Sequence, residues 1–145
     1  MITLIWELLI TEALNELGED SASLGFDLGV KLMEILAFKH PLRLDDPSLK
    51  LKMVSFELWS LLFPGKHLQE VASASPSCVL WDTNDLSWLF RLPPATPTPP
   101  NFAIHLSRFF AGIIQGGVFA LNLNAEVAAR LDKLPTCRFI VELKK

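Results

Sequence analysis

The chain contains the segment FFAGIIQGGVFALNLNAEV at residues 109–127 and the segment LPTCRFIVELKK at residues 134–145. The first segment continues a predicted helix from about Asn101 to Ala120, and two strands are predicted after it, at Ala125–Leu131 and Cys137–Leu143. Every second residue from Cys137 to Leu143 is apolar, which is typical of a strand with one face against helices. The order helix, strand, strand predicts an α+β domain.

The predicted helix from about Asn101 to Ala120 is expected to be buried in the protein and not to span a membrane. Its most apolar part, Phe109–Leu123, is interrupted by Gln115 and Asn122 and is shorter than the roughly 20 residues that a membrane span requires. Gly112 and Gly116 lie four residues apart, so they share one helical face and predict a close packing contact there.

Two further helices are predicted upstream, at Ile2–Leu17 and from Ser21 or Ser23 to about Phe38. The segment Met1–Ile10 lacks the basic start and the cleavage site of a secretory signal, so we expect it to belong to the first helix. Both helices are apolar on more than one side, and such a helix must be covered twice. Gly25 and Gly29 repeat the spacing of four and again predict a close neighbour.

The middle of the chain predicts a third helix and three short strands. Pro47 follows the capping residues Asp45 and Asp46 and begins the helix, which Pro64 and Gly65 end. The predicted strands are Leu68–Ser73, Cys78–Trp81 and Leu86–Arg91, with the last two joined as a hairpin across residues 82–85. The Pro-rich stretch at 93–101 is expected to be a surface loop within a single domain of residues 1–145.

Composition points to an interaction protein. Half of the 145 residues are hydrophobic and mean hydropathy is +0.34, so we expect some apolar surface to remain exposed, and such patches mark contact sites. The net charge is −3 and the basic residues are scattered, which argues against nucleic acid as a partner. Cys78 and Cys137 are expected to be reduced thiols in a cytoplasmic protein.

The sequence contains no recognisable catalytic, cofactor-binding or metal-binding pattern. His40, His67 and His105 are far apart and have no second ligand at metal spacing, and no nucleophile with a base and an orienting group can be assembled. We therefore expect no enzyme activity, no metal and no cofactor.

The chain resembles the small subunits of the TRAPP tethering complex, the superfamily often named after its Bet-three member. The glycine-containing fourth helix and the final strands carry the resemblance through Phe110, Gly112, Gly116, Gly117, Leu121, Cys137 and Phe139. The segments IWELLITEAL (5–14), LGFDLGVKLMEI (24–35) and CVLWDTND (78–85) resemble the subunit-six branch of this family.

The resemblance implies about four helices packed on one side of a twisted antiparallel sheet, and pairing through the first two helices with a Bet-three-type subunit. It also implies assembly with other TRAPP subunits, action in ER-to-Golgi and Golgi trafficking at the cytoplasmic side of those membranes, and indirect support of nucleotide exchange on a Rab-type GTPase. The acylated cysteine of the Bet-three subunit has no counterpart in His40–Asp46. Membrane attachment is therefore expected to be peripheral and to come through the complex.

Two hypotheses for function follow. In the first, a heterodimer surface includes the predicted interface residues Ile5, Leu8, Leu9, Glu12, Leu28, Leu32 and Ile35. For any single one of these residues, packing into the core of its own domain is an equally good interpretation. In the second hypothesis, a pocket between Phe109, Phe110 and the sheet binds a lipid-like small molecule.

Overall fold

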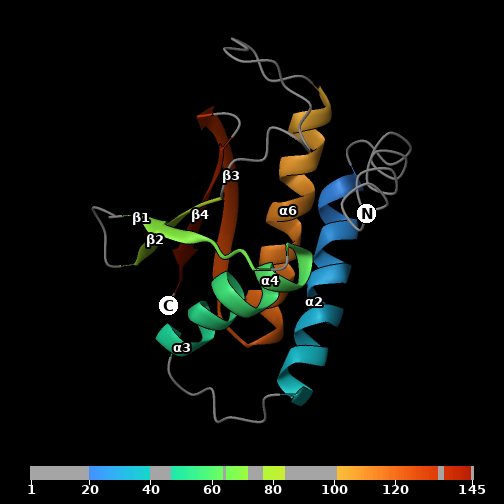
Figure 1. The fold of residues 1–145 in the computed structure, drawn as a ribbon, viewed down its shortest axis with the longest axis vertical. Helices are drawn as coiled ribbons and strands as arrows, with labels where there is room; N and C mark the ends of the chain where they lie inside the picture. The colour runs from blue at the N-terminus through green and yellow to red at the C-terminus, as the bar shows by residue number, and fades with distance from the viewer. Residues whose placement is uncertain are drawn as a thin grey trace.

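The computed structural model describes residues 20–39, 47–63, 65–71, 77–83, 101–133 and 136–144. The described helices cover one face of a four-stranded antiparallel sheet, as Figure 1 shows. Two long helices, α2 (Ser21–Lys39) and α6 (Asn101–Ala120), lie side by side. The α+β architecture with helices on one side of a sheet is confirmed. The predicted first helix, Ile2–Leu17, lies outside the described residues.

The sheet has the strand order β1-β2-β4-β3, and every neighbouring pair is antiparallel. The strands are β1 (Gln69–Val71), β2 (Cys78–Asp82), β3 (Ala125–Lys133) and β4 (Thr136–Leu143). These confirm four of the predicted strands. The fifth, Leu86–Arg91, and part of its hairpin lie outside the described residues. At Leu80–Asp82, β2 pairs with β1 on one side and with β4 on the other.

The core lies between α6 and the inner face of the sheet. On β4 the inward residues Cys137, Phe139 and Val141 are fully buried, which confirms the predicted alternation. From α6 the core receives Leu106, Phe109, Phe110, Ile113, Ile114 and Val118. The fourth helix is therefore a buried core helix, as predicted, and no helix among the described residues is long and apolar enough to cross a membrane.

Glycines allow α2 and α6 to approach each other closely. A Cβ added at Gly25 or Gly29 would come closer than 3.0 Å to the backbone carbonyl of Phe109 or Ile113, respectively. The relationship is reciprocal, because a Cβ at Gly112 or Gly116 would meet the backbone carbonyl oxygens of α2 within the same limit. The two predictions of close packing from the four-residue spacing are thus confirmed, and the two helices are each other's close neighbours.

The predicted third helix is present with an irregular centre. It consists of α3 (Pro47–Lys52), the π-helical η2 (Met53–Leu58) and α4 (Trp59–Leu62). Widening of the turn in η2 leaves the Ser55 carbonyl oxygen available to accept a hydrogen bond from Leu68 N–H at 2.9 Å. This bond attaches the residue before β1 to the helical stretch. Of the Pro-rich stretch at 93–101, only Asn101 is described, and it begins α6 rather than ending a loop.

The sheet register keeps the two cysteines apart. Cys78 pairs with Glu142, whereas Cys137 lies beyond the Asp82 and Arg138 pair at the other end of the β2–β4 ladder. Five residues of strand separate the two positions by about 17 Å, and a disulfide requires Cα atoms within about 7 Å. Cys78 and Cys137 of one chain therefore form no disulfide with each other.

Candidate interaction surface

One side of α2 is used for packing inside the domain. Gly25 and Gly29 contact the backbone of α6, and Met33 and Leu36 on the following turns are buried in the core. This side holds the helix in place and fixes which of its other residues face outward.

The side of α2 next to this packed side carries a second group of apolar side chains. Leu24 is 37% exposed and Ile35 is 50% exposed, while Leu28 and Leu32 are partly buried against the core. At 3.6 residues per turn these four side chains fall within about 80° of arc, so they form one stripe along the helix. We call Leu24, Leu28, Leu32 and Ile35 the α2 stripe. A helix with apolar residues on both sides was predicted, and the structure assigns each side its residues.

Three predicted interface residues, Leu28, Leu32 and Ile35, lie together in the α2 stripe. The other four, Ile5, Leu8, Leu9 and Glu12, lie outside the described residues. Leu24 belongs to the same stripe but was not among the predicted interface residues. Its spacing of four from Leu28 is the signal that identifies it.

Other large hydrophobic side chains are exposed on different elements. Phe56 is 45% exposed and its ring stacks on His67 with a centroid distance of 4.4 Å. Phe119, 60% exposed, contacts the ring of Phe26 at 5.3 Å. His67 is therefore a surface residue whose ring lies against Phe56.

The space proposed for a lipid-like ligand is filled by aromatic rings. Trp59 contacts Phe63, Phe110 and Phe139 with centroid distances of 5.0, 5.4 and 5.9 Å, respectively. Phe109 lies against Phe110 at 5.8 Å. These side chains occupy the region between Phe109, Phe110 and the sheet, so a ligand could enter there only if the rings moved.

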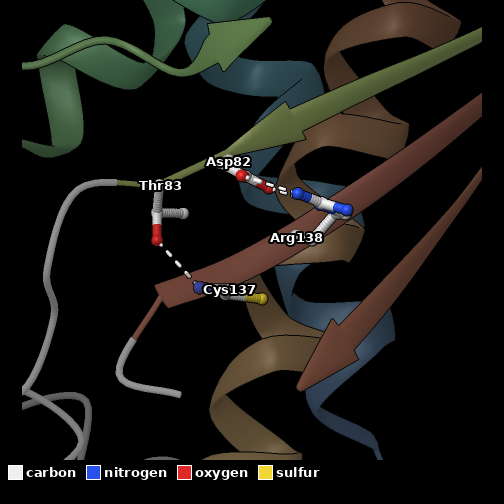
Figure 2. A network of polar contacts seen from close by, with 4 residues as sticks. All are labelled: Asp82, Thr83, Cys137 and Arg138. Carbon is white, nitrogen blue, oxygen red and sulfur yellow. Dashed lines mark hydrogen bonds and ion pairs between the residues drawn. The ribbon is translucent and has the colours of Figure 1, made fainter. Parts of the chain in front are cut away.

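A polar network closes the end of the β2–β4 ladder, as Figure 2 shows. Arg138 donates to both carboxylate oxygens of Asp82, and the Thr83 hydroxyl oxygen accepts a hydrogen bond from Cys137 N–H at 3.0 Å. Burial, with a smaller contribution from the charge of Asp82, raises the pKa of the Cys137 thiol to about 12. This thiol is neutral near pH 7 and is a poor nucleophile.

The described residues contain no group of three or more His, Cys, Asp or Glu side chains that could hold a metal ion. The arrangement of the described residues thus offers a packing surface on α2 and a structural polar network at the end of the sheet.

Comparison with known proteins gives a consistent result. The family model of the transport protein particle (TRAPP) component matches residues 4–144. Mouse trafficking protein particle complex subunit 6B is 25% identical over 126 residues, covering 85% of this chain and 76% of the mouse protein.

A solved structure has the same fold. It is the crystal structure of trafficking protein particle complex subunit 3 from Naegleria fowleri, covalently bound to palmitic acid. The TM-score is 0.72 at 14% identity, and the match covers 99% of this chain and 93% of the Naegleria chain. At this identity the likeness concerns the fold alone. Because the family model matches nearly the whole sequence, the chain belongs to the TRAPP component family.

Proposed function

We propose that this chain is a non-enzymatic structural subunit of a TRAPP vesicle-tethering complex and that it pairs with a Bet-three-type subunit through the α2 stripe. The observation that carries the proposal is the α2 stripe, where Leu24 and Ile35 are exposed on a helix whose adjoining side is already packed on α6. Membership of the TRAPP component family supports the class of partner.

The size of the stripe indicates that it forms only part of the interface. A stable interface buries about 800 Å² on each partner. Complete burial of one exposed Leu or Ile side chain stabilises a complex by roughly 1.5–3 kcal/mol, and partial burial stabilises it by less. Four side chains that are already partly covered fall short of such an area. We therefore include Ile5, Leu8, Leu9 and Glu12 of the first predicted helix in the proposed interface.

The proposed setting is the cytoplasmic side of Golgi and ER–Golgi membranes. There the chain, as one domain of residues 1–145, assembles with other TRAPP subunits and supports guanine-nucleotide exchange on a Rab-type GTPase without being its main contact. The name of the mouse relative, a trafficking protein particle complex subunit, supports this setting. The absence of cysteine from His40–Asp46 supports peripheral attachment through the complex.

Co-purification tests the pairing. We expect a Bet-three-type subunit co-expressed with the wild-type chain to be retained on a tag carried by the chain, and Leu28→Asp or Ile35→Asp to abolish retention. Ile35→Asp is the cleaner variant because Ile35 is half exposed and its replacement leaves the core intact. Ser23→Asp, which adds the same side chain at an exposed α2 position outside the stripe, should leave retention unchanged. Normal retention of Ile35→Asp would contradict the proposal.

The alternative function, binding of a lipid-like molecule, is addressed by native mass spectrometry of the purified chain. The palmitate-bound Naegleria structure has the same fold, but in this chain aromatic rings fill the space between Phe109, Phe110 and the sheet. We expect the measured mass to equal that of the polypeptide. A retained acyl-chain ligand would favour the alternative.

A further inference from the structure

The hydrogen-bond pattern of the β3–β4 ladder determines which backbone groups of β3 point outward. Lys144 N–H donates to Asn124 O at 2.7 Å, which makes this pair a hydrogen-bonded pair at the start of the β3–β4 ladder. In an antiparallel ladder such pairs alternate with non-bonded ones. Glu126, Ala128 and Arg130 therefore bond to β4, whereas the backbone groups of Ala125, Val127 and Ala129 point away from β4, and the register shifts beyond Arg130.

Gln115 of α6 occupies the first part of this edge. Its Nε2 donates to Ala125 O at 2.7 Å, and its Oε1 accepts from Val127 N–H at 2.9 Å. The amide side chain thus bonds to β3 as the backbone of an adjacent strand would. Beyond it, Val127 C=O and both backbone groups of Ala129 have no hydrogen-bond partner among the described residues.

A groove runs beside this part of the edge. It has a volume of about 760 Å³ and is formed by β3 residues 127–131, the first turns of α2 and residues 104–115 of α6. The helices contribute mainly small side chains to its wall, including Ala22, Ser107, Ala111 and Gly112. Small wall residues leave room for the side chains of an extended chain lying next to β3. Figure 1 shows β3 running along α6 on the side away from β1 and β2.

The charge of the groove has one sign. The charged side chains among its described lining residues are Arg108 of α6 and Arg130 of β3, both exposed and neither in an ion pair with another described residue. Arg130 lies on the outer face of the sheet and Arg108 on the helical side. The side chains of an added strand alternate between these two faces. Acidic side chains on either face of that strand would therefore lie near an arginine.

We propose that the edge of β3 at residues 127–131 binds an extended, acidic segment of another protein as an additional strand. Five residues of strand span about 17 Å, and Val127 C=O and both backbone groups of Ala129, which have no partner among the described residues, are the groups that such a segment would bond. A second copy of this chain is a poorer occupant, because edge-to-edge pairing would bring together the arginines of both copies. The edge at residues 127–131 shares no residue with the α2 stripe, so either proposal can fail without the other.

Amide hydrogen exchange measured by NMR on the full chain tests the proposal. In the free chain, Ala129 N–H should exchange rapidly, while Val127 N–H, bonded to Gln115, exchanges slowly. A capped peptide of alternating Glu and Val should bind and slow exchange at Ala129. The corresponding Lys and Val peptide should bind at least about tenfold more weakly because it meets two arginines. Slow exchange of Ala129 in the free chain would mean that the edge is already covered and would overturn the proposal.

Three variants complete the experiment. Ala129→Pro removes the outward N–H without removing a bond to β4, and proline is tolerated at such edge positions, so binding should be lost while the fold is kept. Arg108→Glu with Arg130→Glu should weaken binding of the Glu peptide about tenfold or more. Lys66→Glu, an exposed position outside the described groove lining, should leave binding unchanged.

Three results contradict the assignment. They are the absence of binding to the wild-type chain, equal binding by Ala129→Pro, and a concentration-dependent dimer that Ala129→Pro abolishes. The last result would assign the edge to a second copy.

Discussion

Asp82 and Arg138 face each other across the β2–β4 ladder and form a two-point ion pair, with Nε 2.7 Å from Oδ1 and Nη2 3.0 Å from Oδ2 (Figure 2). Their side chains are 20% and 23% exposed, so the pair is mostly shielded from water. The planar guanidinium matches the carboxylate in a way that an ammonium group does not.

We therefore expect Arg138→Ala to lower the free energy of unfolding by about 1–3 kcal/mol, because it leaves the Asp82 carboxylate half-buried without this partner. Arg138→Lys should retain part of the stability. Urea denaturation measures both. The exposed pair of Lys144 and Glu126 provides the control, and Lys144→Ala should have no measurable effect. An Arg138→Ala variant as stable as the wild type would refute this role.

Close packing of α2 on α6 predicts that Gly29→Ala and Gly116→Ala destabilise the fold. Each added Cβ would meet a backbone carbonyl closer than 3.0 Å, and backbone cannot rotate away as a side chain can. We expect losses of about 1–3 kcal/mol, although alanine is the better helix former. Gly117→Ala is the matched control, because its nearest neighbour is the flexible end of Leu58. In thermal denaturation, Gly117→Ala should have a higher melting temperature than the other two variants. Equal melting temperatures would contradict the packing argument.

The two thiols should differ in reactivity. Cys137 is fully buried with its pKa raised, whereas Cys78 is partly exposed. A thiol reagent such as Ellman's should modify one cysteine of the folded chain at about pH 8 and both cysteines after denaturation. Cys78→Ser should abolish the rapid reaction. Rapid modification of two thiols in the folded wild-type chain would be inconsistent with the buried position of Cys137.

Stability should also depend on alkaline pH through Cys137. The thiol pKa is 9.0 before the effect of the fold and about 12 in the folded chain, so between these values the unfolded chain releases a proton that the folded chain keeps. The free energy of unfolding consequently falls as pH rises through this window, by at most about 1.4 kcal/mol per pH unit from this group. Cys137→Ala should show a smaller fall from about pH 8 to about pH 10.5 in urea denaturation, and an identical slope would contradict this origin.

Gln115 should be required for the order of the adjacent β3 edge. Gln115→Leu removes both bonds to β3 and should cost about 1 kcal/mol of stability and speed exchange of Val127 N–H. Gln115→Glu keeps an acceptor for Val127 but places a carboxylate against Ala125 O, so it should be more stable when protonated at low pH than when ionised. An unchanged exchange rate of Val127 N–H in Gln115→Leu would contradict the role of these two hydrogen bonds.

Much of the local structure could be predicted because its causes lie within a few residues. The helical spacing of apolar residues predicted α2 and α6, alternation from Cys137 to Leu143 predicted β4, and pairs of glycines predicted two close contacts. The π-helical turn at Met53–Leu58 was not predicted, because it goes together with a hydrogen bond that Leu68 N–H, beyond the helix, donates to Ser55 O. Leu24 was missing from the predicted interface for a related reason, since its exposure depends on which side of α2 faces α6.

The sequence by itself therefore determined the kinds of elements, the apolar character of both sides of α2 and the family resemblance, since these follow from local patterns and residue order. Only the tertiary structure decided that Gly25 and Gly29 face α6 and leave the α2 stripe outside, that Asp82 meets Arg138, and that Gln115 covers only the start of the β3 edge. The first two pairings join residues far apart in the chain, and the third joins two elements across the turn between α6 and β3. Their geometry is set by how whole elements pack and in which register the strands align, and no local pattern contains that information.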